Sequence, residues 1–309
     1  MELKSGSNLE KVLKAGHFAF TGELGPPRGA DAHEVKHKAA FLKGNVDSVN
    51  ITDNQTAMVR MASWAACLIL IQEGLEPNFQ MVCRDRNRLA MQADILGAYA
   101  HGIRNMLCLS GDHPKFGDHP TSMGVFDIDS MQLIQMVKKM RDEGKFLGGA
   151  DLHGAPKMFI GAAENPFAEP CDFRVHRLAK KVAAGADFIQ TQCIYNMPKF
   201  REWIRQSVDM GLTEKCYILA GVTPMKNVGM ANYMKNKVPG MDVPDEIIKR
   251  LKGVPKDQAS EEGIKIALEQ IEEFKTMKGV AGVHLMAIEW EHKVPEIAER
   301  AKVLPRPVV

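Results

Sequence analysis

The sequence predicts an α/β protein, a (β/α)8 TIM barrel that forms a single domain over residues 1–309. Short β-rich runs alternate with longer stretches of helical periodicity, which is typical of parallel α/β folds. Eight such strand–helix units fit this length, and eight is the number that closes the barrel. A doubly wound sheet with a small second domain is the alternative. Its G-x-G-x-x-G fingerprint does not occur, no G-x-x-x-x-G-K-S/T phosphate loop occurs, and no linker rich in Pro, Gly or Ser divides the chain.

Each expected strand is followed by its helix, in order along the chain. Strands are assigned to short β-rich runs. Helices are assigned to longer runs with amphipathic spacing, as at Leu178, Val182 and Ala186. The polar segment 111–129, rich in Gly, Pro, Asp and His, is expected to be an exposed loop that carries function. The expected strands are 19–24, 46–52, 78–83, 105–110, 157–161, 188–192, 216–221 and 282–288. The expected helices are 32–43, 57–73, 88–100, 130–143, 174–184, 199–210, 225–237 with 244–251, and 260–277.

Composition and charge exclude several other classes of protein. Hydrophobic residues make up 45% and charged residues 25%, so a disordered, collagenous or coiled-coil chain is excluded. The net charge of +2 gives no basic excess for nucleic-acid binding. The longest apolar run, 61–71, is too short to span a membrane, and residues 1–6 lack an apolar signal segment. We therefore expect a cytoplasmic protein with no membrane or nucleic-acid partner.

Two patterns that could suggest a metal are better explained without one. None of the six cysteines forms a C-x-x-C pair, so this chain alone supplies no zinc ribbon or iron–sulfur cluster, and reduced thiols are expected. Residues 33–37 read His-Glu-Val-Lys-His and match the H-E-x-x-H zinc pattern. They lie in the first expected helix, away from the strand ends, with no third ligand at a plausible spacing. The repeated Asp-His-Pro at 112–114 and 118–120 is similarly interpreted as a loop ordered by proline turns.

Polar residues recur at the carboxyl ends of the expected strands, where a barrel enzyme has its active site. Glu23 lies between apolar neighbours just before Gly25-Pro26-Pro27, so its carboxyl could be poorly solvated and act as a general acid. A structural hydrogen bond to the turn is the alternative. Asp112 could meet a ligand or form an Asx turn. Gln192 could bind a flat heterocycle or be a buried amide satisfied by backbone.

Three basic residues, Arg177, Lys180 and Lys181, lie on the helix expected after the fifth strand. Charges at helical spacing usually form a solvated face. The alternative is that they hold a cofactor phosphate near the strand ends.

The order of motifs along the chain resembles methylenetetrahydrofolate reductase of the bacterial, barrel-only type. Single motifs are weak, but the Glu…Pro-Pro, Gly-Asp and Ala-Gly-Ala…Thr-Gln segments in this order are a strong signal. The resemblance covers about residues 15–305. The segments that carry it are Phe20-Thr21-Gly22-Glu23-Leu24-Gly25-Pro26-Pro27, Asn50-Ile51-Thr52, Gly102-Ile103-Arg104-Asn105, Leu109-Ser110-Gly111-Asp112-His113-Pro114, Ala183-Ala184-Gly185-Ala186-Asp187-Phe188-Ile189-Gln190-Thr191-Gln192 and Gly221-Val222-Thr223-Pro224.

The resemblance implies a flavoprotein oxidoreductase of one-carbon metabolism. It would reduce 5,10-methylenetetrahydrofolate to 5-methyltetrahydrofolate by hydride transfer from a reduced flavin, FAD or FMN. The implied catalytic and folate-binding residues are Glu23 as general acid, Asp112 near the flavin and the pterin, and Gln192 at the pterin. The implied cofactor-binding residues are Thr52, Ser110, Gly111, Asp112, Ala163, Arg177, Lys180 and Lys181, and no metal is implied.

The chain departs from the family's pattern at positions that serve the cofactor. Gln80 stands where the family commonly has His, Ser110 where it has Arg, and Arg174 where it has Asp. The chain is similar to forms from anaerobic one-carbon pathways, which implies an iron–sulfur partner subunit as electron donor and allows for an oligomer. A flavin-free, pterin-binding methyltransferase barrel and a non-catalytic scaffold subunit are the alternative functions.

Overall fold

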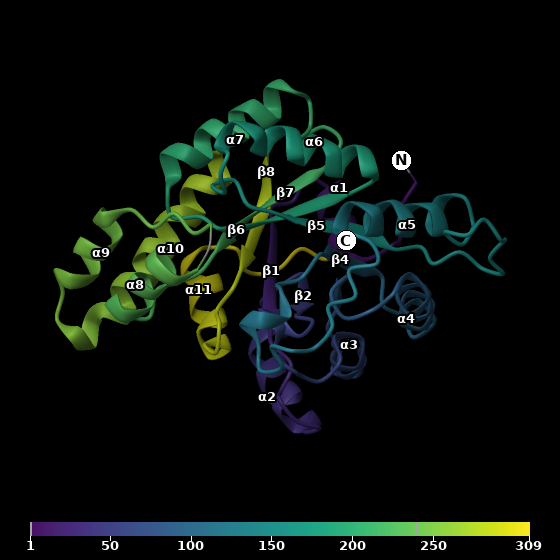
Figure 1. The fold of residues 1–309 in the computed structure, drawn as a ribbon. Helices are drawn as coiled ribbons and strands as arrows, with labels where there is room; N and C mark the ends of the chain where they lie inside the picture. Colours follow the sequence, from purple (N-terminus) through teal and green to yellow (C-terminus); the bar gives the residue numbers. More distant parts are fainter. Residues whose placement is uncertain (1, 239) are drawn as a thin grey trace.

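The computed structural model describes residues 2–238 and 240–309. Its eight parallel strands form one closed barrel in the order β1 to β8, and β8 pairs with β1 (Figure 1). This confirms the predicted (β/α)8 barrel. The strands are β1 (Ala19–Leu24), β2 (Ser48–Ile51), β3 (Pro77–Val82), β4 (Asn105–Leu109), β5 (Phe159–Glu164), β6 (Phe188–Cys193), β7 (Tyr217–Val222) and β8 (Val280–Leu285).

The helices surround the barrel, and within the described chain they begin and end close to the expected positions. Two short helices, α1 and α11, were not expected from the sequence. The helices are α1 (Asn8–Lys14), α2 (Ala32–Leu42), α3 (Ser63–Gln72), α4 (Arg88–Ala100), α5 (Ser130–Asp142), α6 (Arg174–Ala184), α7 (Met197–Asp209), α8 (Val228–Lys237), α9 (Asp245–Lys252), α10 (Ala259–Thr276) and α11 (Val294–Arg300). Across residues 2–238 and 240–309, no helix combines the length and the apolar character needed to cross a membrane.

Several expected boundaries differ from the structure by three residues or more, among them the end of the strand expected over 282–288, which runs from Val280 to Leu285. The helix expected over 57–73 begins only at Ser63, because the preceding residues bond to the loop after β1: the amide of Met61 donates to Pro27 O at 2.9 Å. The strand expected over 157–161 runs instead from Phe159 to Glu164. The strand's last residue, Glu164, is buried and paired with Lys181. A charged residue in the sequence therefore did not mark the end of this strand.

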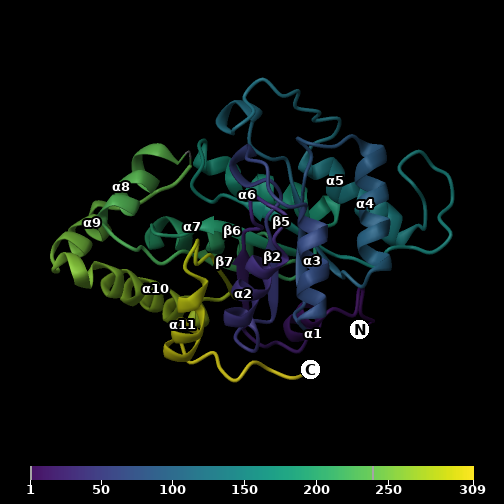
Figure 2. The ribbon, with the colours of Figure 1, turned by 90° about the horizontal axis from the view of Figure 1, so that it is seen from below.

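Helix α1 closes the amino-terminal end of the barrel, opposite the loop 111–129 (Figure 2). Leu9, Val12 and Leu13 pack with Phe159 and Phe188, whose rings stack with centroids 5.1 Å apart. The barrel floor is therefore apolar and covered, and the opposite end stays open for a site.

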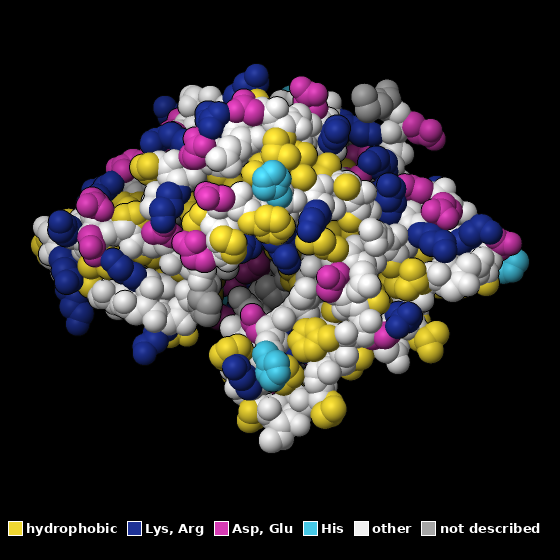
Figure 3. Space-filling view, turned by 45° about the horizontal axis from the view of Figure 1, so that its top comes forward, with side chains coloured by type: hydrophobic (Ala, Val, Ile, Leu, Met, Phe, Trp, Pro, Cys, Tyr) yellow, Lys and Arg dark blue, Asp and Glu magenta, His cyan; other side chains and the backbone are white. Residues whose placement is uncertain are grey.

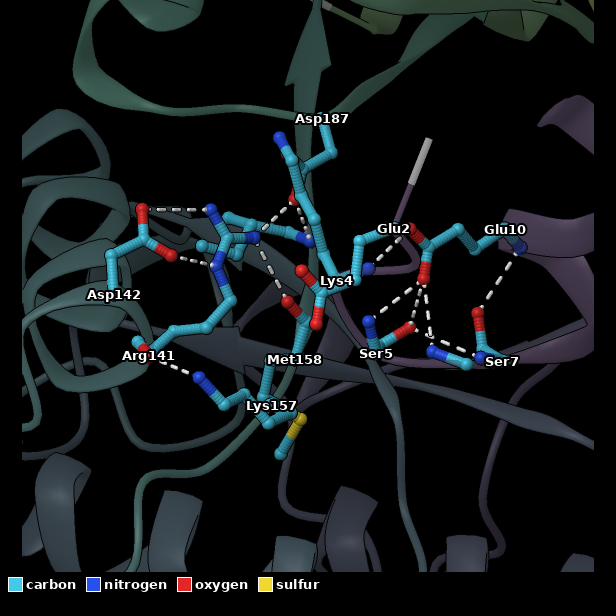
Figure 4. Close-up of polar contacts among 12 residues, drawn as sticks. Glu2, Lys4, Ser5, Ser7, Glu10, Arg141, Asp142, Lys157, Met158 and Asp187 are labelled. Atoms are coloured by element: carbon cyan, nitrogen blue, oxygen red, sulfur yellow. Dashed lines mark hydrogen bonds and ion pairs between the residues drawn. The ribbon is translucent and has the colours of Figure 1, made fainter.

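Charged groups fasten the segment before α1 to this floor (Figure 4). The Glu10 carboxylate accepts the backbone N–H groups of Lys4 at 2.7 Å and Ser5 at 2.8 Å. The Lys4 ammonium and the Arg141 guanidinium both pair with the Asp187 carboxylate. A surface cleft lies beside this cluster, and two of the cations that line it, Lys4 and Arg141, are already paired with Asp187, so we assign no ligand to it.

Candidate active site

The carboxyl ends of the strands surround the open end of the barrel, which we call the mouth. Figure 3 shows a hollow on this face with acidic and basic side chains inside it. Glu23, Thr52 and Gln192 stand at or just after the ends of β1, β2 and β6, as the sequence predicts. The fold therefore places these residues at one end of the barrel.

Glu23 is held between two side chains from other strands. Its side chain is 14% exposed, and its Oε2 lies 3.5 Å from His284 Nε2 on β8 and 3.5 Å from Gln80 Nε2 on β3. Thr21 Oγ1 lies 3.0 Å from the other ring nitrogen of His284. The Glu23 carboxyl thus faces the mouth and is positioned by the imidazole of His284 and the amide of Gln80. This arrangement suits a group that exchanges a proton with a bound substrate.

A chain of buried amides continues from this site into the barrel. Gln190 Nε2 lies 3.4 Å from Thr21 Oγ1, and Gln190 Oε1 accepts Asn50 Nδ2 at 2.6 Å. Asn78 Nδ2 then donates to Asn50 Oδ1 at 2.7 Å. Branched apolar residues usually fill the interior of such barrels, so this polar chain is unusual. Because each amide is fixed by its neighbours, the chain holds Thr21 and, through it, the ring of His284.

His284, Thr21 and Gln190 are functional candidates that the sequence analysis did not select, and it noted Gln80 only as a departure from the family's pattern. The available signal was weak: a single His in an apolar strand and amides within strands. The contact between Glu23 and His284 arises only when β8 closes onto β1, with Thr21 aligned to His284.

The other predicted side chains differ in how firmly they are held. Thr52 is 3% exposed, and its hydroxyl has no hydrogen-bond partner among the described residues. The Gln192 side-chain oxygen accepts the amide of Cys193 at 3.1 Å. Burial, together with a smaller effect of the Glu23 carboxylate, raises the pKa of the Cys193 thiol to about 11.

Asp112 lies in the loop after β4, with its side chain exposed. Its backbone oxygen accepts Arg84 Nη1 at 3.1 Å, so the buried Arg84 fixes the start of the loop. Gly111 adopts φ +88°, and a Cβ there would meet the Val82 side chain at 3.0 Å, so glycine is required. Ser110 Oγ accepts the amide of Ser130, which begins α5, at 3.2 Å.

The basic residues of α6 have different environments. Lys181 is buried and its ammonium pairs with Glu164 Oε2 at 2.7 Å and with the backbone oxygen of Ala163. Burial lowers the pKa of Lys181, although Glu164 opposes the change. Lys180 lies over the ring of Phe173 at 5.1 Å. Arg177 forms no ion pair within the described chain, so its charge is available to a ligand.

The histidines of the H-E-x-x-H pattern lie on α2, as expected. His37 contacts the edge of Phe41, with ring centroids 5.2 Å apart, and Glu34 pairs with Lys38. Asp118 of the second Asp-His-Pro pairs with Arg28. Within the part of the chain that the structure describes, no group of three or more His, Cys, Asp or Glu is placed to hold a metal ion.

Comparisons with known proteins identify the family to which this chain is similar. A family model described as "Methylenetetrahydrofolate reductase" matches residues 8–302. "Methylenetetrahydrofolate reductase (NADH) 1" from Arabidopsis thaliana is 27% identical over 77% of this chain and 41% of that protein. The "5,10-methylenetetrahydrofolate reductase" of Pectobacterium carotovorum is 24% identical over 74% of this chain and 75% of that protein. The chain thus spans about two fifths of the length of the plant relative.

A solved structure shows the same fold. It is an uncharacterized protein from Clostridium thermocellum that binds two copies of 5-methyl-5,6,7,8-tetrahydrofolic acid. The TM-score is 0.65 at 12% identity, over 96% of this chain and 99% of that one. At this identity the similarity supports the barrel fold alone.

Proposed function

This chain belongs to the methylenetetrahydrofolate reductase family, and from this premise we propose that it reduces 5,10-methylenetetrahydrofolate to 5-methyltetrahydrofolate with a bound flavin. The observation that carries the proposal is the carboxyl of Glu23, which faces the mouth and is held from behind by His284 and Gln80.

Glu23 would act as the general acid. Opening the imidazolidine ring of the folate breaks the bond between the one-carbon unit and N10, and N10 must then receive a proton. The Glu23 carboxyl would supply it, and a positioned acid of this kind typically contributes a factor of about 10²–10⁴. His284 and Gln80 would hold the carboxyl toward the substrate. Gln192 would bind the pterin through its amide group.

The residues around the mouth fit a flavin. The buried Thr52 hydroxyl lacks a partner among the described residues, which suits a polar atom of a bound ligand. The residues that would hold the flavin are Thr52, Ser110, Gly111, Asp112, Ala163, Arg177 and Lys180. Lys181 already has an internal partner and would act indirectly, through Glu164. When bound, the flavin supplies the hydride.

The electron donor would be a cysteine-rich, iron–sulfur partner subunit that approaches the mouth. Gln80 and Ser110, which replace the residues common in the resembled family, both lie at this end of the barrel, and Gln80 contacts Glu23. We expect the isolated chain to accept electrons from artificial dyes and to react slowly or not at all with NADH. Anaerobic mixing with NADH tests this by the bleaching of the flavin absorbance, and rapid complete bleaching would contradict the need for a partner.

The absorbance spectrum of the purified protein, with chromatography of the released cofactor, tests the proposed function and distinguishes FAD from FMN. A yellow protein that reduces or oxidises folate with a dye supports it. A colourless protein that retains folate-dependent methyl transfer would overturn it in favour of a methyltransferase.

Changing Glu23→Gln tests the proposed acid. Folate turnover should fall about 10²-fold or more while flavin stays bound and reducible, because the amide has the same shape but no acidic proton. Glu214→Gln is the control, since that exposed carboxylate lies just before β7, at the other end of the barrel. Equal turnover in both variants would exclude the role of Glu23.

A further inference from the structure

A small gap lies beside Gly25 at the mouth, one layer above Glu23. Side chains alternate along a strand, so Gly25 follows Glu23 on the inward face of the chain as it leaves β1. A Cβ built on Gly25 would lie 3.8 Å from Thr52 Oγ1 and 3.9 Å from Arg60 Nη1. The absent side chain therefore leaves a space bordered by a hydroxyl and a guanidinium.

The two side chains that border the gap are only partly satisfied by hydrogen bonds. The Thr52 hydroxyl and Arg60 Nε are buried without a hydrogen bond among the described residues. Within residues 2–238 and 240–309, the guanidinium donates a hydrogen bond through Nη1 alone, to Pro26 O at 2.8 Å. Unsatisfied buried polar atoms are rare in native proteins and call for an explanation, such as a bound ion or ligand.

Arg60 also lacks a carboxylate partner, in contrast to most arginines of the described chain. The nearby carboxylates are already paired, Asp53 with Arg86 and Asp118 with Arg28. Arg60 therefore carries a charge that no described residue neutralises, next to the candidate active site.

The backbone around Arg60 is held in an unusual conformation. Asn54, Thr56 and Ala57 have φ values of +43°, +56° and +58°, a region that costs non-glycine residues about 1 kcal/mol or more each. The Asn54 side chain accepts the Arg60 amide at 3.0 Å. Packing against Gly117, where a Cβ would lie 1.8 Å from Ala57 O, holds the segment in place. The fold thus maintains a strained segment that presents Arg60 at the mouth.

We propose that Arg60 and Thr52, with the gap at Gly25 between them, form a binding site for an anionic oxygen of a ligand in the mouth. The free guanidinium nitrogens can donate to a carboxylate or a phosphate, and the Thr52 hydroxyl can donate a further hydrogen bond. This inference rests on the proposed function for the identity of the ligand. The anion is either a carboxylate of the folate glutamyl tail or a phosphate of the bound nucleotide.

Direct binding measurements test the site with paired ligands. For the folate, affinities of 5-methyltetrahydrofolate and of the primary amide of 5-methyltetrahydropteroic acid, which lacks the glutamate and carries no carboxylate, are compared. For the nucleotide, affinities of FMN and riboflavin are compared. The variants are Arg60→Met, Arg60→Lys and Gly25→Ala. Arg201→Met, an exposed arginine on α7 with the same charge change, is the control.

In the wild-type chain and in Arg201→Met, removing the anion from the ligand should cost affinity. In Arg60→Met the anionic member of one pair should bind about tenfold more weakly, while its neutral partner is unaffected. Arg60→Lys should recover part of the loss. Gly25→Ala should fold, because its methyl group meets only ordinary contact distances, but should weaken the same anionic ligand by filling the gap.

The pair of ligands whose affinities are changed by the variants identifies the source of the anion, either the folate tail or the nucleotide phosphate. If Arg60→Met and Gly25→Ala bind both anionic ligands within twofold of wild type, the inference is wrong. A wild-type chain that binds neither folates nor flavins would instead overturn the proposed function. A variant that loses thermal stability but keeps its ligand affinities would show a purely structural role for Arg60 and would also refute the site.

Discussion

The buried pair between Lys181 and Glu164 offers a sharp test of how the site is built. Replacing Lys181 with Met removes the ammonium but keeps much of the side chain's apolar volume. It leaves Glu164, whose side chain is 1% exposed, without the partner that now lies 2.7 Å away. If Lys181 is an internal support rather than a phosphate ligand, the main effect should be on stability.

The expected loss can be estimated from the geometry of the pair. Removing one partner of a buried ion pair typically costs about 3–5 kcal/mol, because the remaining charge stays in an apolar environment. For a chain of this length such a loss lowers the melting temperature by about 5–8 °C. The double variant Lys181→Met/Glu164→Gln should recover much of the loss, since neither charge then remains buried.

Urea denaturation of the wild type, both single variants and the double variant gives the coupling free energy. Flavin affinity, measured below the unfolding transition, is the second readout. The reasoning would be refuted if Lys181→Met were as stable as the wild type but bound flavin tenfold more weakly. That result would show that the ammonium serves the ligand instead of Glu164.

Three further changes test other parts of the structure. Asp112→Asn should raise the flavin reduction potential, measured by potentiometry, because a negative charge disfavours the anionic reduced cofactor. It should also weaken folate binding, measured by titration. An unchanged potential together with an unchanged folate affinity would contradict the placement of Asp112 near the flavin and the pterin. Although burial opposes it, the amides of Lys4, Ser5 and Gly6 lower the pKa of Glu10 to about 2 from 4.5. Ionised Glu10 therefore stabilises the fold by at most about 3 kcal/mol above pH 4.5, and this stabilisation is lost as the pH falls from 4.5 to 2. In Glu10→Gln, the free energy of unfolding measured in urea should no longer show this part of the pH dependence. Replacing both His33 and His37 with Ala should leave activity intact, because the H-E-x-x-H pattern is interpreted as a chance match. One zinc ion per chain in the wild type that is absent from the double variant would contradict this interpretation.

The alternation of strands and helices was predictable because each element carries its own periodic signal. The bounds expected for β1, α4 and α6 agree with the structure. Helix α4 begins where Asn87 caps it, with the side-chain oxygen accepting the amides of Leu89 and Ala90. Local capping chemistry of this kind is readable in a sequence.

Two differences between the expected and the observed helices have different origins. Helix α1 carried a readable signal, since Ser7 caps it and Glu10 stands three positions later, as in a capping box. The late start of α3 carried none: residues before Ser63 are apolar enough for a helix. Their backbone groups bond instead to the loop after β1, a tertiary contact that no local pattern contains.

The site shows the same limit. Glu23 could be selected from its place before a proline turn. Its partners Gln80 and His284 lie on other strands, and the distance of 3.5 Å to each depends on the closed barrel. The gap at Gly25 was likewise hidden, because Arg60 was expected to lie within a helix.

The closure of β8 onto β1 also has a consequence for how the chain is made. Val283 pairs with Phe20, so β1 lacks one of its two neighbours until almost the whole barrel has been synthesised. At typical rates of synthesis this takes roughly 10–50 s. During that time the edge of β1 can pair with other strands. A product that stops before Val280 retains this open edge permanently, so we expect such fragments to aggregate or be degraded rather than to show partial activity.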